Sequence, residues 1–189
     1  CCSSRSKTIL IPPSILRSGH IYGYQVCHSL NRVNPMDEHN KEEILVVEEL
    51  LGRRPQGKFE IAVRRSDGTP RVIKNAPFLD DGTPMPTLYW LIDPVDKLRI
   101  SRLESNGAIP IAEAEIGLGK IDSAHERYKK ERNKMIPDSH SGPAPTGGVG
   151  GTRVGVKCLH AHYAWFLAGG DDPVGIWTEQ KLIAEDLKE

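Results

Sequence analysis

The first predicted element is an amphipathic helix that begins near Asn40. Ile44, Val47 and Leu51 recur at the spacing of one helical face, and charged residues occupy positions between them. Gly52 follows directly, and glycine often ends a helix because it adopts the left-handed conformation without steric cost. The pattern therefore predicts a helix that ends at Gly52.

Three later segments have the alternation or the composition of strands. Phe59, Ile61 and Val63 alternate with polar residues, as expected for a half-buried strand. The turn signal at 66–69 predicts that the chain folds back, and a loop rich in proline, aspartate and glycine separates the second and third segments. The predicted strands are 59–63, 71–75 and 87–92.

The second half of the chain has helical patterns with one long interruption. An Asp-Pro pair starts a helix whose predicted apolar face is Val95, Leu98 and Leu103. The stretch 137–152 contains prolines and glycines without apolar periodicity, which predicts a long loop. The other predicted helices are 111–135, 154–168 and 177–187.

The order of elements and the composition together predict the fold class. One helix, three strands and then several helices is an order typical of an α+β protein. The chain has 189 residues, of which 38% are hydrophobic and 26% are charged, so it can bury one core. We expect a single α+β domain with a small antiparallel or mixed three-stranded sheet, packed by about four or five helices.

Residues 1–35 differ in composition from the rest of the chain. They contain no Asp or Glu and hold three of the four cysteines. This composition is similar to that of a transit peptide, but two consecutive prolines interrupt any amphipathic helix there. The chain does not begin with methionine, and Met36 precedes the first helix signal. We expect a disordered leader or upstream read-through at 1–35, with Met36 as the start and 36–189 as the domain.

Charge and cysteine content argue against several classes of partner. The formal net charge is zero, so we expect neither a nucleic acid nor a membrane surface as a binding partner. No apolar run approaches the roughly 18–20 residues that span a bilayer. The domain has one cysteine, Cys158, and no internal disulfide, which is typical of a reducing compartment. We expect a soluble cytoplasmic protein whose cofactor, if it has one, these features do not identify.

A glycine-rich run before the predicted helix 154–168 is the first candidate site. Backbone N–H groups in such a loop and at the start of a helix attract anions. The run is not a P-loop, because that motif has Gly-Lys-Ser/Thr directly after a strand. A flexible linker whose glycines only permit a tight turn is the favoured alternative. The candidate ligand-binding residues are Gly147, Gly148, Gly150, Gly151, Thr152, Arg153 and Lys157.

Cys158 and two histidines are the main candidates for chemistry. Cys158 and His162 are four residues apart on the predicted helix and share a face, whereas His160 points about 200° away from Cys158. A thiol near a helix N-terminus, beside Lys157 and a histidine, is activated as a nucleophile. The candidate catalytic residues are therefore Cys158, His160 and His162.

Two other interpretations of these residues stay open. Cys158 and His162 suit a zinc ion as ligands, although zinc needs at least one more. Core packing is the commonest role of single cysteines and of histidines on apolar helices. On frequency alone, core packing is the favoured interpretation.

Tyr89 and Trp90 form a further candidate surface. They are adjacent in a predicted strand, so their rings point to opposite faces of the sheet. We expect one ring in the core and the other in a ligand-binding groove.

Four segments resemble a known bacterial family. They are Leu51-Gly-Arg-Arg-Pro, Asp81-Gly-Thr-Pro-Met-Pro-Thr-Leu-Tyr-Trp-Leu, Ile100-Ser-Arg-Leu-Glu-Ser-Asn-Gly and Val156-Lys-Cys-Leu-His-Ala-His-Tyr-Ala. On these motifs, between about residues 48 and 177, the chain is identified as a member of the family catalogued as domain of unknown function 501, found mainly in actinobacteria. The family has no established activity, so the resemblance implies no catalytic residue. Its genes often lie near those of a septum-formation initiator and an exopolyphosphatase, which mildly favours a phosphate ligand or a role in cell division.

Three functions of different class are compatible with these features. The first, which is slightly favoured, is a small protein that binds an anionic, phosphate-type ligand at Gly147–Thr152 beside Cys158 and His162, with or without enzymatic activity. The second is a non-catalytic interaction module linked to cell division or polyphosphate metabolism, with an unknown protein partner. The third is a fold stabilised by zinc.

Overall fold

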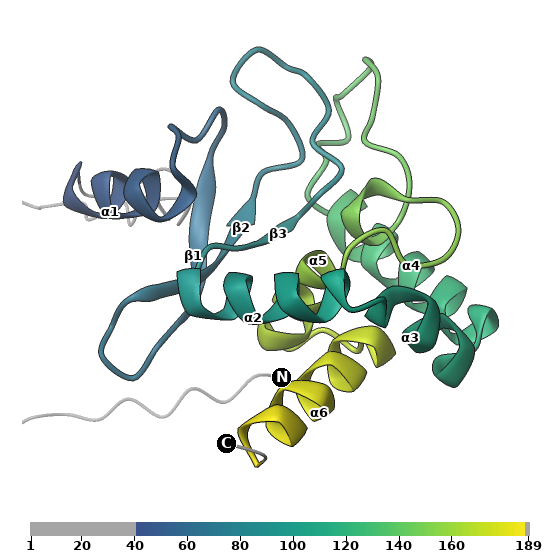
Figure 1. Cartoon of the computed structure of the whole chain (residues 1–189). Coiled ribbons are helices and arrows are strands. Elements are labelled where there is room, and N and C mark those ends of the chain that lie inside the picture. Colours follow the sequence, from purple (N-terminus) through teal and green to yellow (C-terminus); the bar gives the residue numbers. More distant parts are fainter. Residues whose placement is uncertain (1–40, 188–189) are drawn as a thin grey trace, which may run out of the picture. The chain divides into compact units, whose positions relative to one another are not determined.

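The computed structural model describes residues 41–187, and the predicted leader and Met36 lie outside the described residues. One helix, three strands and a group of helices follow one another along this part of the chain, as Figure 1 shows. No helix within 41–187 is long and apolar enough to cross a lipid bilayer. In chain order the elements are α1 (Lys41–Leu51), β1 (Phe59–Arg64), β2 (Pro70–Asn75), β3 (Tyr89–Leu91), α2 (Pro94–Ser105), α3 (Ala108–Ile116), α4 (Leu118–Asn133), the 3₁₀ helix η2 (Val149–Gly151), α5 (Leu159–Leu167) and α6 (Pro173–Asp186).

The three strands form one antiparallel sheet in the order β1-β2-β3. In the β1–β2 hairpin Phe59 lies opposite Asn75, and on the other side of β2 Ile73 lies opposite Trp90. The predicted α+β fold with a three-stranded sheet is confirmed, and the antiparallel alternative is the correct one. The described residues contain six α-helices, where about four or five were expected.

Each face of the sheet packs against a different layer. Ile73 of β2 belongs to a cluster with Val47 of α1 and Phe59 of β1, whereas the neighbouring Val72 belongs to the larger core that the helices form. The two clusters separate because successive side chains of a strand point to opposite faces. Helix α1 therefore packs on one face, and α5 packs against β3 (Figure 1).

Helix α2 buries a different face from the predicted one. Asp96 and Leu103 are buried, whereas Val95 and Leu98 are 56% and 54% exposed, so the prediction for these two apolar residues is wrong. Asp96 faces inward because Arg71 donates a hydrogen bond to its carboxylate at 2.6 Å. A buried carboxylate requires such a partner, and this ion pair sets which side of α2 faces the sheet.

The predicted helix at 111–135 is in fact two helices. Gly117 lies between α3 and α4 with φ 86° and ψ 136°, a conformation that glycine adopts far more easily than other residues. The chain changes direction there, which the apolar periodicity alone does not reveal. Ile121 and Tyr128 of α4 are buried.

Helix α5 begins at Leu159, so the predicted helix start near residue 154 is wrong. Gly155 has φ 66°, and Cys158 has the extended angles φ −164° and ψ 125°, so neither residue is helical. The carboxylate of Glu104 in α2 accepts the N–H of Leu159 at 2.6 Å, which satisfies the first backbone donor of α5. Cys158 therefore precedes α5 and is not part of its helical face.

Arg132 of α4 anchors the long loop at 137–152. Its side chain is fully buried, and its guanidinium donates to the carbonyl oxygens of Pro86, Pro145 and Gly147 at 3.2, 2.9 and 2.9 Å. Burial lowers the pKa of Arg132, because desolvation disfavours the charged form. The predicted loop is present, and this buried cation holds its path against α4.

The hydroxyl of Tyr128 ties the start of β3 to α4. It is fully buried and accepts the backbone N–H groups of Leu88, at 2.5 Å, and Tyr89, at 3.3 Å. Replacing Tyr128 with phenylalanine leaves these two donors without a partner, so we expect the free energy of unfolding to fall by about 1–3 kcal/mol. Urea denaturation measures this loss, and a denaturation midpoint equal to that of the wild type would contradict the assigned role.

Candidate functional site

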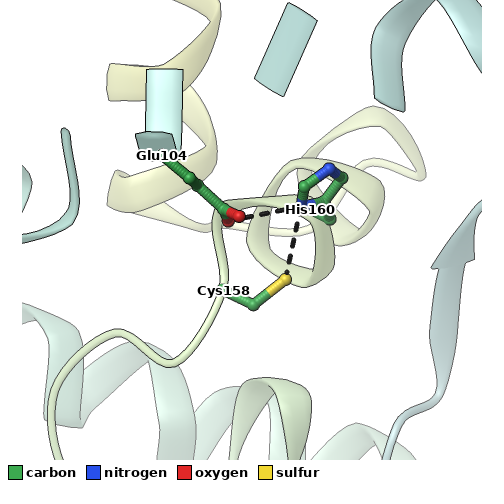
Figure 2. Close-up of side chains that lie close together, drawn as sticks. All are labelled: Glu104, Cys158 and His160. Atoms are coloured by element: carbon green, nitrogen blue, oxygen red, sulfur yellow. Dashed lines mark hydrogen bonds and ion pairs between the residues drawn. The ribbon is translucent and has the colours of Figure 1, made fainter. Parts of the chain in front are cut away.

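Three side chains meet where α5 begins, as Figure 2 shows. Glu104 comes from α2, Cys158 immediately precedes α5, and His160 lies in the first turn of α5. The Nδ1 atom of His160 lies 3.2 Å from Oε1 of Glu104 and 3.5 Å from Sγ of Cys158. We call these residues the Glu–Cys–His cluster, and each of them is partly exposed to solvent.

The hydrogen bonds of His160 determine which ring nitrogen faces the cluster. Its Nε2 lies 3.1 Å from the carbonyl oxygen of Lys97 and 3.2 Å from Oγ of Ser101. Since a carbonyl oxygen only accepts, Nε2 carries a hydrogen, and Nδ1 is the atom that faces the carboxylate and the sulfur. Burial opposes a charge on the ring, but the Cys158 sulfur and the Glu104 carboxylate outweigh it and raise the pKa of His160 to about 9.

A cavity of about 370 Å³ lies beside the cluster, along the edge strand β3 and the start of α5. We call it the β3–α5 cavity. Cys158 and His160 of the cluster contribute to its lining. Arg53, Lys97 and Lys157 are the charged side chains around it, and the described residues contribute no aspartate or glutamate to the lining.

The glycine-rich run has internal backbone hydrogen bonds and does not lead directly into a helix, as had been expected for the anion site. Gly148 donates its N–H to the carbonyl oxygen of Thr152 at 2.7 Å, and Gly151 donates to that of Gly148 at 3.0 Å. A non-helical stretch separates η2 from α5, so the run does not enter the helix directly. Of the residues predicted here, Gly150 and Lys157 line the β3–α5 cavity. The others, which are not in its lining, are Gly147, Gly148, Gly151, Thr152 and Arg153.

His162 lies apart from the cluster, in the protein interior. Its side chain is 1% exposed, and Nδ1 donates to the carboxylate of Asp172 at 2.7 Å. Asp172 also caps α6, which begins before the predicted start near residue 177. The His162 ring packs beside His125, with the ring centroids 5.6 Å apart. The expectation that Cys158 and His162 share a helical face is wrong, because Cys158 lies outside the helix.

Tyr89 and Trp90 both contribute to the lining of the cavity. Tyr89 is 5% exposed and belongs to the larger core, where its hydroxyl donates to Glu131 at 2.6 Å. Trp90 is half-buried on the other face of the sheet, and the guanidinium carbon of Arg53 lies 4.8 Å from its ring centroid. Tyr89 is thus the core ring and Trp90 the ring nearer the surface.

Sequence reasoning missed Glu104, Ser101 and Lys97, all on α2. They are spaced by four and three residues, so they share one face of that helix, and this polar stripe is visible in the sequence. The stripe alone does not show what it faces, because His160 is 56 residues away from Glu104 along the chain. Only the packing of α2 against α5 brings the groups together.

The part of the chain that matches a known protein family includes the Glu–Cys–His cluster. The family described as "Protein of unknown function (DUF501)" matches residues 61–180, which is more than half of the chain and includes Glu104, Cys158 and His160. No curated protein and no solved structure gives a significant match. The resemblance that the sequence motifs indicate is thereby confirmed, and the chain belongs to the DUF501 family.

Proposed function

We propose that this protein binds a small anionic molecule with a flat apolar part in the β3–α5 cavity. The observation that carries the proposal is the charge of the lining, in which Arg53, Lys97 and Lys157 occur without an aspartate or glutamate among the described residues. Cations that line a concave surface focus their field and raise the local concentration of anions. The negative group of the ligand therefore belongs beside these three side chains.

The walls of the cavity favour a ligand that also has a flat apolar part. Tyr89 and Trp90 supply aromatic surface, and Leu51, Leu91 and Ala161 supply aliphatic surface. Aromatic rings pack well against other planar groups. The volume of about 370 Å³ falls within the range of about 300–1,000 Å³ that is usual for small-molecule sites.

The Glu–Cys–His cluster makes catalysis on the bound anion the natural extension of this proposal. Cys158 supplies a potential nucleophile in the wall of the cavity, and the His160 ring lies 3.5 Å from its sulfur. The Glu104 carboxylate contacts the same Nδ1 atom at 3.2 Å, and the carbonyl oxygen of Lys97 holds the ring from Nε2 at 3.1 Å. A nucleophile, a ring that transfers protons and an orienting carboxylate are the parts that such chemistry requires.

Phenyl phosphate is a suitable probe, because it combines an anionic group with an aromatic ring. By isothermal titration calorimetry we expect it to bind more tightly than inorganic phosphate or phenol. Replacing Lys157 with glutamine should weaken its binding by about tenfold, because a lost charged contact removes about 1.5 kcal/mol or more.

Lys120 is the matched control, since it is an exposed lysine of α4 outside the cavity lining. The Lys120→Gln variant should bind phenyl phosphate as the wild type does. Absence of phenyl phosphate binding, or an equal loss in both variants, would overturn the proposal.

A further inference from the structure

We infer that Glu104, Cys158 and His160 are the three protein ligands of a divalent metal ion of the Zn²⁺ type, with a fourth coordination position open to the β3–α5 cavity. The inference goes beyond the proposed function and does not depend on the anionic ligand. It is an alternative to the nucleophile role of Cys158, because a metal-bound sulfur and Nδ1 are not free for that chemistry. Three donor atoms from these side chains all lie within 4.8 Å of one another. Sulfur, imidazole nitrogen and carboxylate oxygen are the donors that zinc uses in proteins.

The two donor distances from His160 Nδ1 match those of a tetrahedral site. Zinc binds sulfur at about 2.3 Å and nitrogen or oxygen at about 2.0–2.1 Å. With tetrahedral angles, ligated sulfur and nitrogen atoms then lie about 3.6 Å apart, and ligated nitrogen and oxygen atoms about 3.3 Å apart. The corresponding distances from His160 Nδ1 are 3.5 Å to the Cys158 sulfur and 3.2 Å to the Glu104 oxygen.

The surroundings of the cluster hold two of the three donors in place. A metal-binding histidine nearly always donates its second ring N–H to a carbonyl oxygen or carboxylate, which fixes the ring orientation. His160 makes this contact through Nε2 to the carbonyl oxygen of Lys97 at 3.1 Å, and this leaves Nδ1 for the metal. The Glu104 oxygen is held by the N–H of Leu159 at 2.6 Å.

The β3–α5 cavity indicates where the fourth coordination position of the metal lies. Structural zinc sites have four protein ligands, whereas catalytic sites have three and a water or substrate molecule. Cys158 and His160 both line the β3–α5 cavity, so a metal between them is accessible from it. His162, which the sequence had offered as a zinc ligand with Cys158, is not among the donor atoms that meet here, and its side chain is 1% exposed in the interior.

The test uses the full chain, stripped of metal with a chelator and titrated with Zn²⁺ and then with Co²⁺. We expect one tightly bound zinc ion per chain. Cobalt should give a sulfur-to-metal charge-transfer band in the near ultraviolet and the intense visible bands of four-coordinate Co²⁺. The three variants Cys158→Ser, His160→Gln and Glu104→Gln should each weaken binding by more than about 100-fold, since loss of an outer-sphere partner alone costs about 10–100-fold.

The other cysteines of the chain supply the internal control. The Cys158→Ser variant retains Cys1, Cys2 and Cys27, so metal bound through those residues would remain in it. Loss of the charge-transfer band in this variant supports the site. An unchanged band, or no stoichiometric zinc in the wild type, would overturn it and leave the three side chains as a metal-free hydrogen-bonded group.

Failure of this inference and failure of the proposed function are distinguishable. Metal binding is measured without an anion, and phenyl phosphate binding is measured in chelator-treated protein. Zinc binding without phenyl phosphate binding would refute only the anion proposal. Phenyl phosphate binding without stoichiometric zinc would refute only the metal site.

Discussion

Replacing Arg132 with methionine is expected to lower the free energy of unfolding by about 3–5 kcal/mol, because several carbonyl oxygens lose a charged donor and each unsatisfied buried acceptor costs about 1–3 kcal/mol. The guanidinium is fully buried, and it donates to carbonyl oxygens of Pro86, Pro145 and Gly147. Methionine fills part of the volume but donates no hydrogen bond. These carbonyl groups then lose a charged partner in the interior, where an unsatisfied polar group is costly.

The Arg132→Met variant should also release the loop at 137–152. Hydrogen exchange and limited proteolysis detect this release, and urea denaturation measures the loss of stability. Lys130→Met is the matched control, because Lys130 is an exposed residue of the same helix. We expect its stability to remain within about 0.5 kcal/mol of the wild type. Equal stability of the Arg132 and Lys130 variants would show that the buried cation does not anchor the loop.

Replacing Asp172 with alanine is expected to lower the free energy of unfolding by about 3–5 kcal/mol. Asp172 is fully buried and accepts the Nδ1–H of His162 at 2.7 Å. It also accepts the N–H groups of Val174 and Gly175 and so caps α6, a contact that contributes about 1 kcal/mol. Alanine removes the cap and leaves a buried histidine and two backbone donors without their partner.

Asp171 provides the control for this experiment, because it is the adjacent residue and has the same side chain. Its side chain is 75% exposed and pairs with Arg127 at the surface. We expect the Asp171→Ala variant to lose no more than about 1 kcal/mol. Asp172→Asn, which keeps an acceptor for the α6 N–H groups, should fall between the two. Differential scanning calorimetry ranks the three variants, and similar melting temperatures for Asp171→Ala and Asp172→Ala would refute the role of the pair.

Ligand binding by the Asp172→Asn variant also shows whether His162 has a structural or a functional role. If the buried pair with Asp172 only stabilises the fold, Asp172→Asn should bind phenyl phosphate and zinc as the wild type does, at a temperature where the variant is folded. A loss of either ligand without a loss of structure would place His162 in the functional site.

Local sequence patterns determined the framework of this protein. The alternation at Phe59 and Ile61 and the turn after it encode the hairpin, because strand period and turn chemistry depend on neighbouring residues. Gly52 ends α1 with φ 70°, as its position after the apolar face predicts. The family assignment likewise follows from contiguous motifs, which the match over residues 61–180 confirms.

Helix boundaries and faces were decided by contacts between distant residues. The apolar pattern alone did not place the break at Gly117, nor did it show that Val95 of α2 faces solvent. The buried face of α2 depends on an ion pair between Asp96 and Arg71 of β2, which lies in another element. A buried ion pair can therefore place a different side of a helix in the core than hydrophobicity alone predicts.

The candidate site required the tertiary structure. The sequence by itself determined that Cys158 has histidines nearby along the chain, but the spacing favoured the wrong one, since it assumed a continuous helix through residue 158. The extended backbone at Cys158 and the carboxylate of Glu104 bring His160 to the sulfur instead, and Asp172 holds His162 in the interior. Periodicity encodes which residues can share a face, whereas the partner of a polar side chain depends on how distant segments pack.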